Sequence, residues 1–395
     1  MEYRKYLVVF IFMAAINVSK AQVVKTFEQA DSTSNALSQS ADWKQLIDFG
    51  QLSINAGFDF PALRQRLGNA YMMEQNYSAA LAEYDMVFKN DSYNQTARYY
   101  AYLCRKYLNQ DQGASYNASY VDTTVLKNKD ITPYGLLTGG LETGLKYPGD
   151  KYRGTASYTR VSLSNRLSWR WQLEQSLAYF NQSVTDNVVQ IPGAPRVSTD
   201  YADQQFEYYG KLSFSMNENV QLIGVYHYLH ANYQNVGYSN NIGLAGIKYT
   251  GSYVDIQADV NMGNITGQHL NQYNATLMLY PMGNLNFYLV SRGSYHDQNG
   301  GNGVFEQSVG YKLFKNTWAQ TSATFGSQDN YVDADGLYIY NAIDATTLRV
   351  GQTIFYQLNN HAQLQLNYTY EKKKDDNHNL NYNQNSITAG LLWKF

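Results

Sequence analysis

The sequence predicts a mainly β fold: a transmembrane antiparallel β-barrel of about fourteen strands, preceded by a small α-helical domain. The first observation is the chain's last twelve residues, in which every second residue is apolar. These apolar residues are Ile387, Ala389, Leu391, Trp393 and Phe395. The second observation is that this alternation recurs from residue 133 onward, in segments joined by alternately short and long connections. Such sorting of turns and loops is typical of transmembrane β-barrels.

The composition fits strands that meet lipid on one face and water on the other. Charged residues make up 16% of the 395-residue chain, below the roughly 25% typical of soluble domains, and tyrosine occurs 38 times. A net charge of -2 gives no field that attracts nucleic acid, so we predict no nucleic-acid partner. The mean hydropathy of -0.47 argues against a bundle of membrane-spanning helices. The single cysteine, Cys104, is predicted to be a core residue.

Residues 1–21 have the features of a secretory signal peptide. Basic residues precede an apolar run over residues 6–18, which is too short to span a bilayer, and small residues stand at the cleavage positions Ser19 and Ala21. We therefore expect the mature chain to begin at Gln22. No later apolar run is long enough for a transmembrane helix. Export combined with half-apolar strands predicts the outer membrane of a Gram-negative cell, with outer-membrane lipid as a partner.

Residues 22–40 are polar without a clear period and are expected to form a linker. Residues 41–130 have helical periodicity and are expected to form a periplasmic domain, in which Pro61 opens one helix. The small and large residues there match a tetratricopeptide repeat, whose small residues let two antiparallel helices approach. The matching positions are Leu67, Gly68, Tyr71, Ala80, Tyr84 and Val87. Arg64 and Ser92 depart from that pattern.

The barrel is expected over residues 131–395, with fourteen candidate strands and twelve as the alternative. The candidates span residues 134–147, 152–164, 168–183, 202–216, 219–233, 240–251, 252–263, 269–281, 284–296, 303–315, 317–329, 344–358, 361–373 and 384–395. Short turns are expected at Ser164-Asn165, Asn217-Glu218, Thr250-Gly251, Met282-Gly283, Asn316 and Asn359-Asn360. Longer loops are expected over 181–201, 234–240, 297–302, 330–343 and 374–383. The even count places both chain ends in the periplasm.

Aromatic side chains mark the predicted membrane interfaces, because rings that are apolar at one end and polar at the other prefer the headgroup region. At the periplasmic interface we expect Trp169, Trp171, Trp318, Trp393 and Phe395. Polar residues are expected to face inward, since a lipid-facing Lys or Arg costs about 2–4 kcal/mol. The predicted lumen charges are Arg170, Glu174, Glu207, Lys211, Asp255, Asp259, Arg292, Glu306, Lys312, Arg349 and Glu371. Because both signs occur about equally, they favour salt bridges that brace the lumen, with a solute pathway as the alternative.

The order of these parts resembles the YaiO family of outer-membrane proteins. The resemblance rests on GLETGLKY at 140–147, YRGTASYTRVSLSNRLSW at 152–169 and the closing Trp393-Lys394-Phe395, and it covers about two-thirds of the chain. It implies a barrel of undetermined biochemical function. The arrangement is also broadly similar to exporters that join periplasmic tetratricopeptide repeats to a barrel, although those usually carry a longer repeat array.

Candidate chemical sites give weaker signals. His227 and His230 are three residues apart, which on a strand places them on opposite faces, so they do not share a metal. The acidic segment 329–336 resembles a calcium loop, but Tyr331 would occupy the first EF-hand ligand position, so a solvated loop is favoured. No His stands at an informative spacing from a nucleophile. We therefore predict no catalytic, cofactor-binding or metal-binding residues and no cofactor.

The sequence thus predicts a non-enzymatic outer-membrane barrel with two alternative roles. In the favoured interpretation, the barrel anchors residues 41–130, which dock a protein partner from an envelope assembly or export machine. In the alternative, the lumen conducts a solute or an exported polymer, and the helices guide or gate it.

Overall fold

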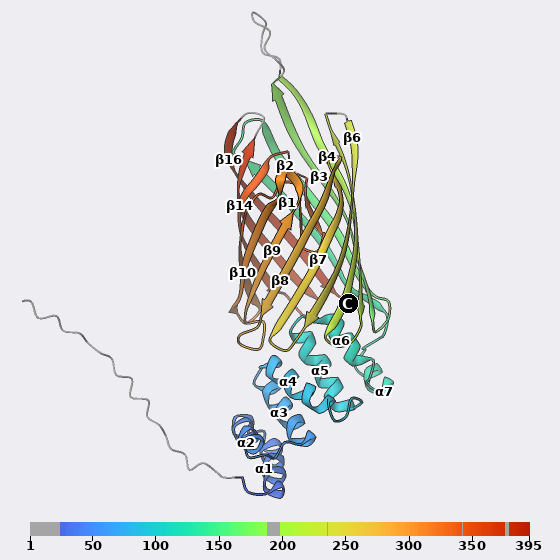
Figure 1. The fold of residues 1–395 in the computed structure, drawn as a ribbon, viewed down its shortest axis with the longest axis vertical. Coiled ribbons are helices and arrows are strands. Elements are labelled where there is room, and N and C mark those ends of the chain that lie inside the picture. The colour runs from blue at the N-terminus through green and yellow to red at the C-terminus, as the bar shows by residue number, and fades with distance from the viewer. Residues whose placement is uncertain (1–23, 188–197, 235, 342, 376–378) are drawn as a thin grey trace, which may run out of the picture.

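The helical domain and the barrel are both present in the computed structural model, which describes residues 24–187, 198–234, 236–341, 343–375 and 379–395. Figure 1 shows the barrel upright, with the helices gathered below one end of it. The predicted signal peptide lies outside the described residues. Within the described part of the chain, no helix combines the length and apolar character needed to cross a membrane.

Seven helices precede the barrel among the described residues. They are α1 (Phe27–Gln39), α2 (Trp43–Asn55), α3 (Pro61–Met73), α4 (Tyr77–Phe88), α5 (Gln95–Tyr107), α6 (Asp111–Ala118) and α7 (Thr123–Lys127). Helix α1 shows that the prediction of a linker over 22–40 was wrong. Thr26 caps this helix by accepting a hydrogen bond from the Gln29 amide at 3.2 Å. Its buried contacts come from Ala30 and Ser34, small residues that leave no apolar stripe to recognise in the sequence.

Helices α3 and α4 bring together the six positions that matched a tetratricopeptide repeat. Fully buried among them are Leu67, Ala80, Tyr84 and Val87, while Tyr71 is partly buried. A Cβ on Gly68 would lie 2.6 Å from the ring of Tyr84, so the helices approach this closely only because Gly68 has no side chain. The tetratricopeptide assignment itself stays a prediction.

Fourteen antiparallel strands form the closed barrel, which confirms the predicted count and excludes the alternative of twelve. They are β1 (Gly135–Pro148), β2 (Arg153–Arg166), β3 (Trp171–Asn187), β4 (Ser198–Ser215), β5 (Val220–Tyr233), β6 (Val236–Thr250), β7 (Val254–Ile265), β8 (Gln268–Leu279), β9 (Phe287–His296), β10 (Asn302–Phe314), β11 (Thr317–Phe325), β14 (Ala345–Gln357), β15 (Ala362–Asp375) and β16 (Leu380–Lys394). The last strand closes the barrel on the first, with Leu391 opposite Leu141.

The barrel wall is apolar outside and polar inside. On β15, Leu364, Leu366 and Tyr368 are between 41% and 54% exposed on the outer face. Glu371, which has inward parity on the same strand, is 4% exposed. The outer face as a whole carries a broad set of exposed apolar side chains. They include Leu141, Val161, Leu177, Phe206, Leu222, Ile247, Ile256, Leu277, Phe305 and Ile387. A surface of this kind is stable against hydrocarbon and not against water.

Several connections differ from the expected ones. The β2–β3 turn lies at residues 167–170, because Ser164 still pairs with Glu174 in the ladder. At the end away from the helices, β6 begins at Val236 and β16 at Leu380, so the loops expected over 234–240 and 374–383 are shorter than predicted. A short 3-10 helix, Gln298–Gly300, forms part of the β9–β10 connection.

Candidate functional site

The connection between β11 and β14 does not extend outward as a solvated loop. It contains two short strands, β12 (Tyr331–Asp333) and β13 (Tyr338–Tyr340), paired as a hairpin. We call residues 326–344 the lumen hairpin, because its contacts are with inward-facing side chains of the barrel wall. Its turn needs left-handed backbone at Ala334, Asp335 and Gly336, with φ angles of 49°, 56° and 81°.

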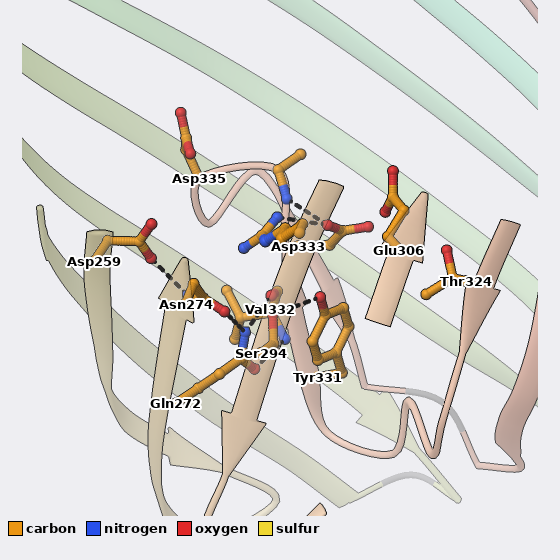
Figure 2. Close-up of polar contacts among 12 residues, drawn as sticks. Asp259, Gln272, Asn274, Ser294, Glu306, Thr324, Tyr331, Val332, Asp333 and Asp335 are labelled. Atoms are coloured by element: carbon orange, nitrogen blue, oxygen red, sulfur yellow. Dashed lines mark hydrogen bonds and ion pairs between the residues drawn. The ribbon is translucent and has the colours of Figure 1, made fainter. Parts of the chain in front are cut away.

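Asp333 fixes the hairpin to one side of the wall. Its carboxylate lies 2.7 Å from Arg292 Nη1 on β9 and 2.7 Å from Arg349 Nη2 on β14. Arg349 also lies 3.4 Å from Glu306 on β10, which completes a network of four charges. Figure 2 shows Asp333 between Asp335 and Glu306, and Tyr331 beside Ser294. Because all four side chains are largely buried, each charge depends on its partners for stabilisation.

The hairpin turn is fixed to the opposite side of the wall. Asp335 accepts hydrogen bonds from Lys211 Nζ at 2.9 Å and from Gln257 Nε2 at 2.7 Å. The carbonyl oxygen of Gly336 lies 2.6 Å from His227 Nδ1. Arg160 donates to the carbonyl oxygen of Leu337 at 3.0 Å. The turn is therefore held by β2, β4, β5 and β7.

Apolar contacts also hold the hairpin. Leu337 packs against a cluster made of Tyr209, Ile223, Val225 and Leu244. Val332 packs against a second cluster made of Ile242, Ile265 and Leu270. These apolar residues have inward parity on their strands, although the alternating pattern predicted that polar residues would face inward. These residues could have indicated that a segment inserts into the lumen. The pair Asp335-Gly336, which lies between two alternating runs, could also have indicated a hairpin.

Ten of the eleven predicted lumen charges lie on barrel strands, and six of them join the networks around the hairpin. Those six are Glu174, Lys211, Glu207, Arg292, Glu306 and Arg349. Arg170 was wrongly expected in the lumen: it lies in the β2–β3 turn, with its guanidinium 5.2 Å from the ring centre of Tyr116 in α6. Lys312 lies over the ring of Trp318 at 5.2 Å.

The other three predicted lumen charges accept hydrogen bonds from neutral side chains. Asp255 accepts from Tyr280 at 2.9 Å and also lies 3.6 Å from Lys248. Asp259 accepts from the amide of Asn274, a contact drawn in Figure 2. Glu371 accepts from the amide of Gln384 at 2.5 Å.

Further charges of the lumen wall were not predicted from the sequence. They include Glu142, Lys146, Arg153, Arg160, Asp203, Lys248 and Lys373. Strand parity could have identified all of them except Arg153, because they alternate with outward residues. Arg153 has the parity of the outward Val161 and faces inward only because a β-bulge lies between it and Ala156. Arg153 pairs with Asp344 of the lumen hairpin at 2.8 Å, and Arg160 with Glu207 at 3.0 Å. The hairpin residue Tyr338 donates to Glu142 at 3.1 Å.

The residues expected to form an aromatic girdle fall into two groups. Trp171, Trp393 and Phe395 are 41%, 45% and 62% exposed. Trp169 instead packs against a cluster of α6 and α7 residues, and Trp318 has the inward parity of its strand. Those two expectations are therefore wrong, because the helices and the lumen, and not lipid, surround these rings.

The α5–α6 segment covers the mouth of the barrel at the helical end. Gln110 donates to Asp255 and to the carbonyl oxygen of Gly251, both at 2.9 Å. Gln112 accepts from Ser215 at 2.8 Å. Arg105, fully buried, donates to Asn219 of the β4–β5 turn. We call residues 105–113 the lid.

A second contact joins the α3–α4 turn to the β8–β9 turn. The amide of Ser78 donates to the carbonyl oxygen of Gly283 at 3.0 Å, and Asn284 donates to the carbonyl oxygen of Gln75 at 3.0 Å. A Cβ on Gly283 would lie 1.8 Å from Asn76 Oδ1, and Gly283 has a φ of 68°. The helical domain is thus held at two places and has a fixed orientation on the barrel.

The described residues enclose three polar cavities that follow one another inside the barrel. A distal cavity of about 140 Å³ lies between the hairpin strand β13 and the wall formed by β1–β4, β15 and β16. A central cavity of about 580 Å³ lies beside the hairpin. A proximal cavity of about 140 Å³ lies between Asp335 and residues 109–112 of the lid.

These cavities adjoin one another. The distal and central cavities share the lining residues Lys146, Tyr158, Tyr338, Tyr340 and Glu371. The central and proximal cavities share Gln257 and Asp335. The three cavities therefore form a series that passes the hairpin on one side and ends at the lid.

Asp85 and Cys104 are among the groups of the helical domain whose pKa values are shifted. Burial raises the pKa of Asp85 in α4 to about 6, against an opposing effect of the nearby Arg105 guanidinium. Burial also raises the pKa of Cys104 to about 12, which keeps this core thiol protonated and unreactive.

No three His, Cys, Asp or Glu side chains in the described ranges are placed to hold a metal ion. His227 is fully buried with inward parity, whereas His230, three residues later, has outward parity on the same strand.

Comparison with known proteins gives structural likenesses only. No protein-family model matches the sequence, and the search of curated proteins found no match. Among solved structures, the Pseudomonas putida toluene transporter TodX aligns over 71% of this chain and 91% of its own, with 8% identity and a TM-score of 0.45. A TodX deltaS2S3 mutant, a monoaromatic hydrocarbon channel, aligns over 65% and 89%, with 10% identity and a TM-score of 0.47. The Acinetobacter baumannii outer membrane protein Omp33 aligns over 66% and 99%, with 7% identity and a TM-score of 0.39.

Proposed function

We propose that this protein is a non-enzymatic outer-membrane barrel that works as a gated pore for small polar solutes. The apolar outer wall supports insertion in a membrane, because moving its exposed apolar side chains from water into lipid lowers their free energy. The helical domain then lies in the periplasm, with both chain ends on that side. The lumen hairpin and the lid are the two gates.

The series of adjoining cavities is the observation that carries this proposal. A barrel that served only as an anchor would gain stability from a filled interior, since voids forfeit contacts. Here a space of about 580 Å³ runs beside the hairpin and is lined by hydroxyl, amide and charged groups. Water and small polar solutes are stable in such a space. What separates it from the periplasm is the lid, held mainly by hydrogen bonds of Gln110 and Gln112.

Single-channel recording in planar bilayers tests the proposal. We expect rare openings of the wild-type protein and more frequent openings after residues 329–341 are replaced by a short Gly-Ser linker. The double variant Gln110→Ala, Gln112→Ala should also raise the open probability by loosening the lid. A Gly-Ser insertion at Gly267, which contacts neither gate, is the control. If the wild type, the hairpin replacement and the double lid variant all showed no openings, a pore would be ruled out.

Docking of a periplasmic protein partner is a second candidate function. It is favoured by the two-point attachment of the helical domain, which holds α1–α3 at a fixed angle below the barrel (Figure 1). Photo-crosslinking in cells from Leu52, exposed on α2, should capture a defined partner, whereas crosslinking from Tyr134, exposed beside the barrel mouth, should not. Equal labelling from both positions would count against a docking surface.

A further inference from the structure

The cavity walls carry more acidic than basic residues. Among the described residues that line the three cavities, ten are acidic and seven are basic. The acidic residues are Asp111, Glu142, Glu174, Asp203, Glu207, Glu306, Asp333, Asp335, Asp344 and Glu371. The basic residues are Lys146, Arg153, Lys211, Lys248, Arg292, Arg349 and Lys373. The equal balance of the charges predicted from sequence does not describe the walls of the actual cavities.

Most of the cavity-lining cations are neutralised by neighbouring carboxylates. Arg292 and Arg349 share Asp333 and Glu306, and so form a network with no net charge. Lys211 lies within 4.0 Å of both Asp335 and Glu174, and Arg153 lies within 3.3 Å of both Asp344 and Asp375. The Lys211 network retains one excess negative charge. A permeating ion therefore meets little positive potential from these four basic residues.

Three cavity-lining carboxylates are held by neutral hydrogen-bond donors, with no cation within ion-pair distance in the described residues. Asp203 accepts from Gln205, Glu142 from Tyr338, and Glu371 from Gln384. Asp203 and Glu371 both line the distal cavity and are otherwise buried, each only 4% exposed. Glu371 lies where the distal and central cavities adjoin, and Glu142 lines the central cavity beyond it.

Two basic residues oppose this negative potential. Lys373 donates to the hydroxyl of Thr346 at 2.9 Å and to the carbonyl oxygen of Asp344 at 3.2 Å, so its ammonium is held between β14 and the lumen hairpin. Lys146 lies over the ring of Phe180 at 5.7 Å and lines the same junction as Glu371. Over all three cavities, including the paired networks, the lining still has more carboxylates than cations.

We infer that the pathway selects cations over anions, and that Glu142, Asp203 and Glu371 determine this selectivity. The reason is that unpaired carboxylates in a narrow passage with low-dielectric walls raise the local concentration of cations and exclude anions. This inference rests on the proposed pore and names its solute class: inorganic cations and small organic ammonium ions.

Reversal potentials of the wild-type protein in a KCl gradient test the inference. We expect a K⁺/Cl⁻ permeability ratio above one. The triple variant Glu142→Gln, Asp203→Asn, Glu371→Gln keeps the hydrogen-bond acceptors and should lower the ratio toward one or below it. Lys146→Gln, the matched variant at the same junction, should raise the ratio above that of the wild type.

The outcomes separate this inference from the proposed function. Openings with a ratio at or below one in the wild type would overturn the cation selectivity and leave the pore intact. A triple variant that conducts with an unchanged ratio would overturn the role of the three carboxylates. If neither the wild type nor the gate-altered variants ever opened, the proposed pore would be overturned, and the cation selectivity with it. Heat-modifiable migration on gels confirms that each variant is a folded barrel.

Discussion

His227 Nδ1 lies 2.6 Å from the carbonyl oxygen of Gly336, while its Nε2 lies 3.5 Å from Glu207. One side chain of β5 therefore contacts both the turn of the lumen hairpin and a carboxylate of the wall. The imidazole is fully buried, so water does not replace either contact.

Replacing His227 should release the hairpin turn. The variant His227→Ala removes the contact with Gly336 and leaves the carbonyl without its partner, at a cost of about 1–3 kcal/mol. We expect faster amide exchange in residues 331–340 and little change in the barrel strands, measured by hydrogen–deuterium exchange in detergent. His230→Ala alters the outer face of the same strand and is the control. Equal exchange in the two variants would contradict the role of His227.

Replacing Asp333 should destabilise the hairpin more strongly. Asp333→Asn leaves Arg292 and Arg349 buried with a single carboxylate, Glu306, between them. Removing one partner of a buried pair costs about 3–5 kcal/mol, and the water-accessible cavity beside it should lower that figure. We expect proteolytic cleavage within residues 326–344 at protease concentrations that leave the wild type intact.

The peripheral member of the same network provides the comparison. Glu306→Gln removes only the 3.4 Å contact with Arg349, so its effect on cleavage should be smaller. A Glu306→Gln variant cleaved as readily as Asp333→Asn would show that Asp333 is not the central anion of the network.

Stability of the helical domain should depend on pH through Asp85. Its folded pKa of about 6 exceeds the ordinary value of an aspartate, so the folded state binds this proton more tightly than the unfolded state. Stability is therefore highest below the ordinary pKa and falls as pH rises toward 6. Asp85→Asn should stabilise the helices at pH 8 by on the order of 2 kcal/mol, with the difference vanishing near pH 4.

Loss of helical ellipticity at moderate urea measures this effect in the full chain, because barrel strands contribute little helical signal. Asp48→Asn, on the neighbouring helix α2, is the control substitution. A wild type and an Asp85→Asn variant with parallel stability profiles from pH 4 to 8 would exclude a raised pKa at this site.

Gly283 should control the attachment of the helical domain to the barrel. Gly283→Ala places a Cβ 1.8 Å from Asn76 Oδ1 and strains a positive φ, so the α3–α4 turn should lift from the β8–β9 turn. We expect easier proteolysis between α7 and β1. Gly267→Ala is matched, since Gly267 has a φ of 77° and no neighbour within 4 Å. Similar proteolysis in both variants would indicate backbone strain alone.

The architecture followed from the sequence because each strand carries a local pattern. Leu364, Leu366 and Tyr368 alternate with polar residues whatever the rest of the chain does, and the closing Trp393 marks the last strand. The strand count needs only such local patterns. Helix α1 was missed because Ala30 and Ser34 bury their contacts without an apolar stripe.

The interior was not predicted, because its contacts join residues far apart in the chain. Asp333 was assigned to a solvated acidic loop, and its partner Arg292 to the lumen wall, yet nothing local indicates that the two meet. Glu142 and Tyr338 are 196 residues apart. The inward apolar residues, such as Ile223 and Leu244, were a local indication that something besides water would fill the lumen.

The position of the lumen hairpin in the chain has a consequence for assembly. Its partners lie on β1, β2, β4, β5, β7, β8, β9 and β14, whereas the hairpin itself joins β11 to β14. Most of the wall strands must therefore assemble before the hairpin can make these contacts. Contacts between residues far apart in the chain form slowly. A nascent barrel would be water-filled and leaky first, and would seal itself only as its final strands arrive.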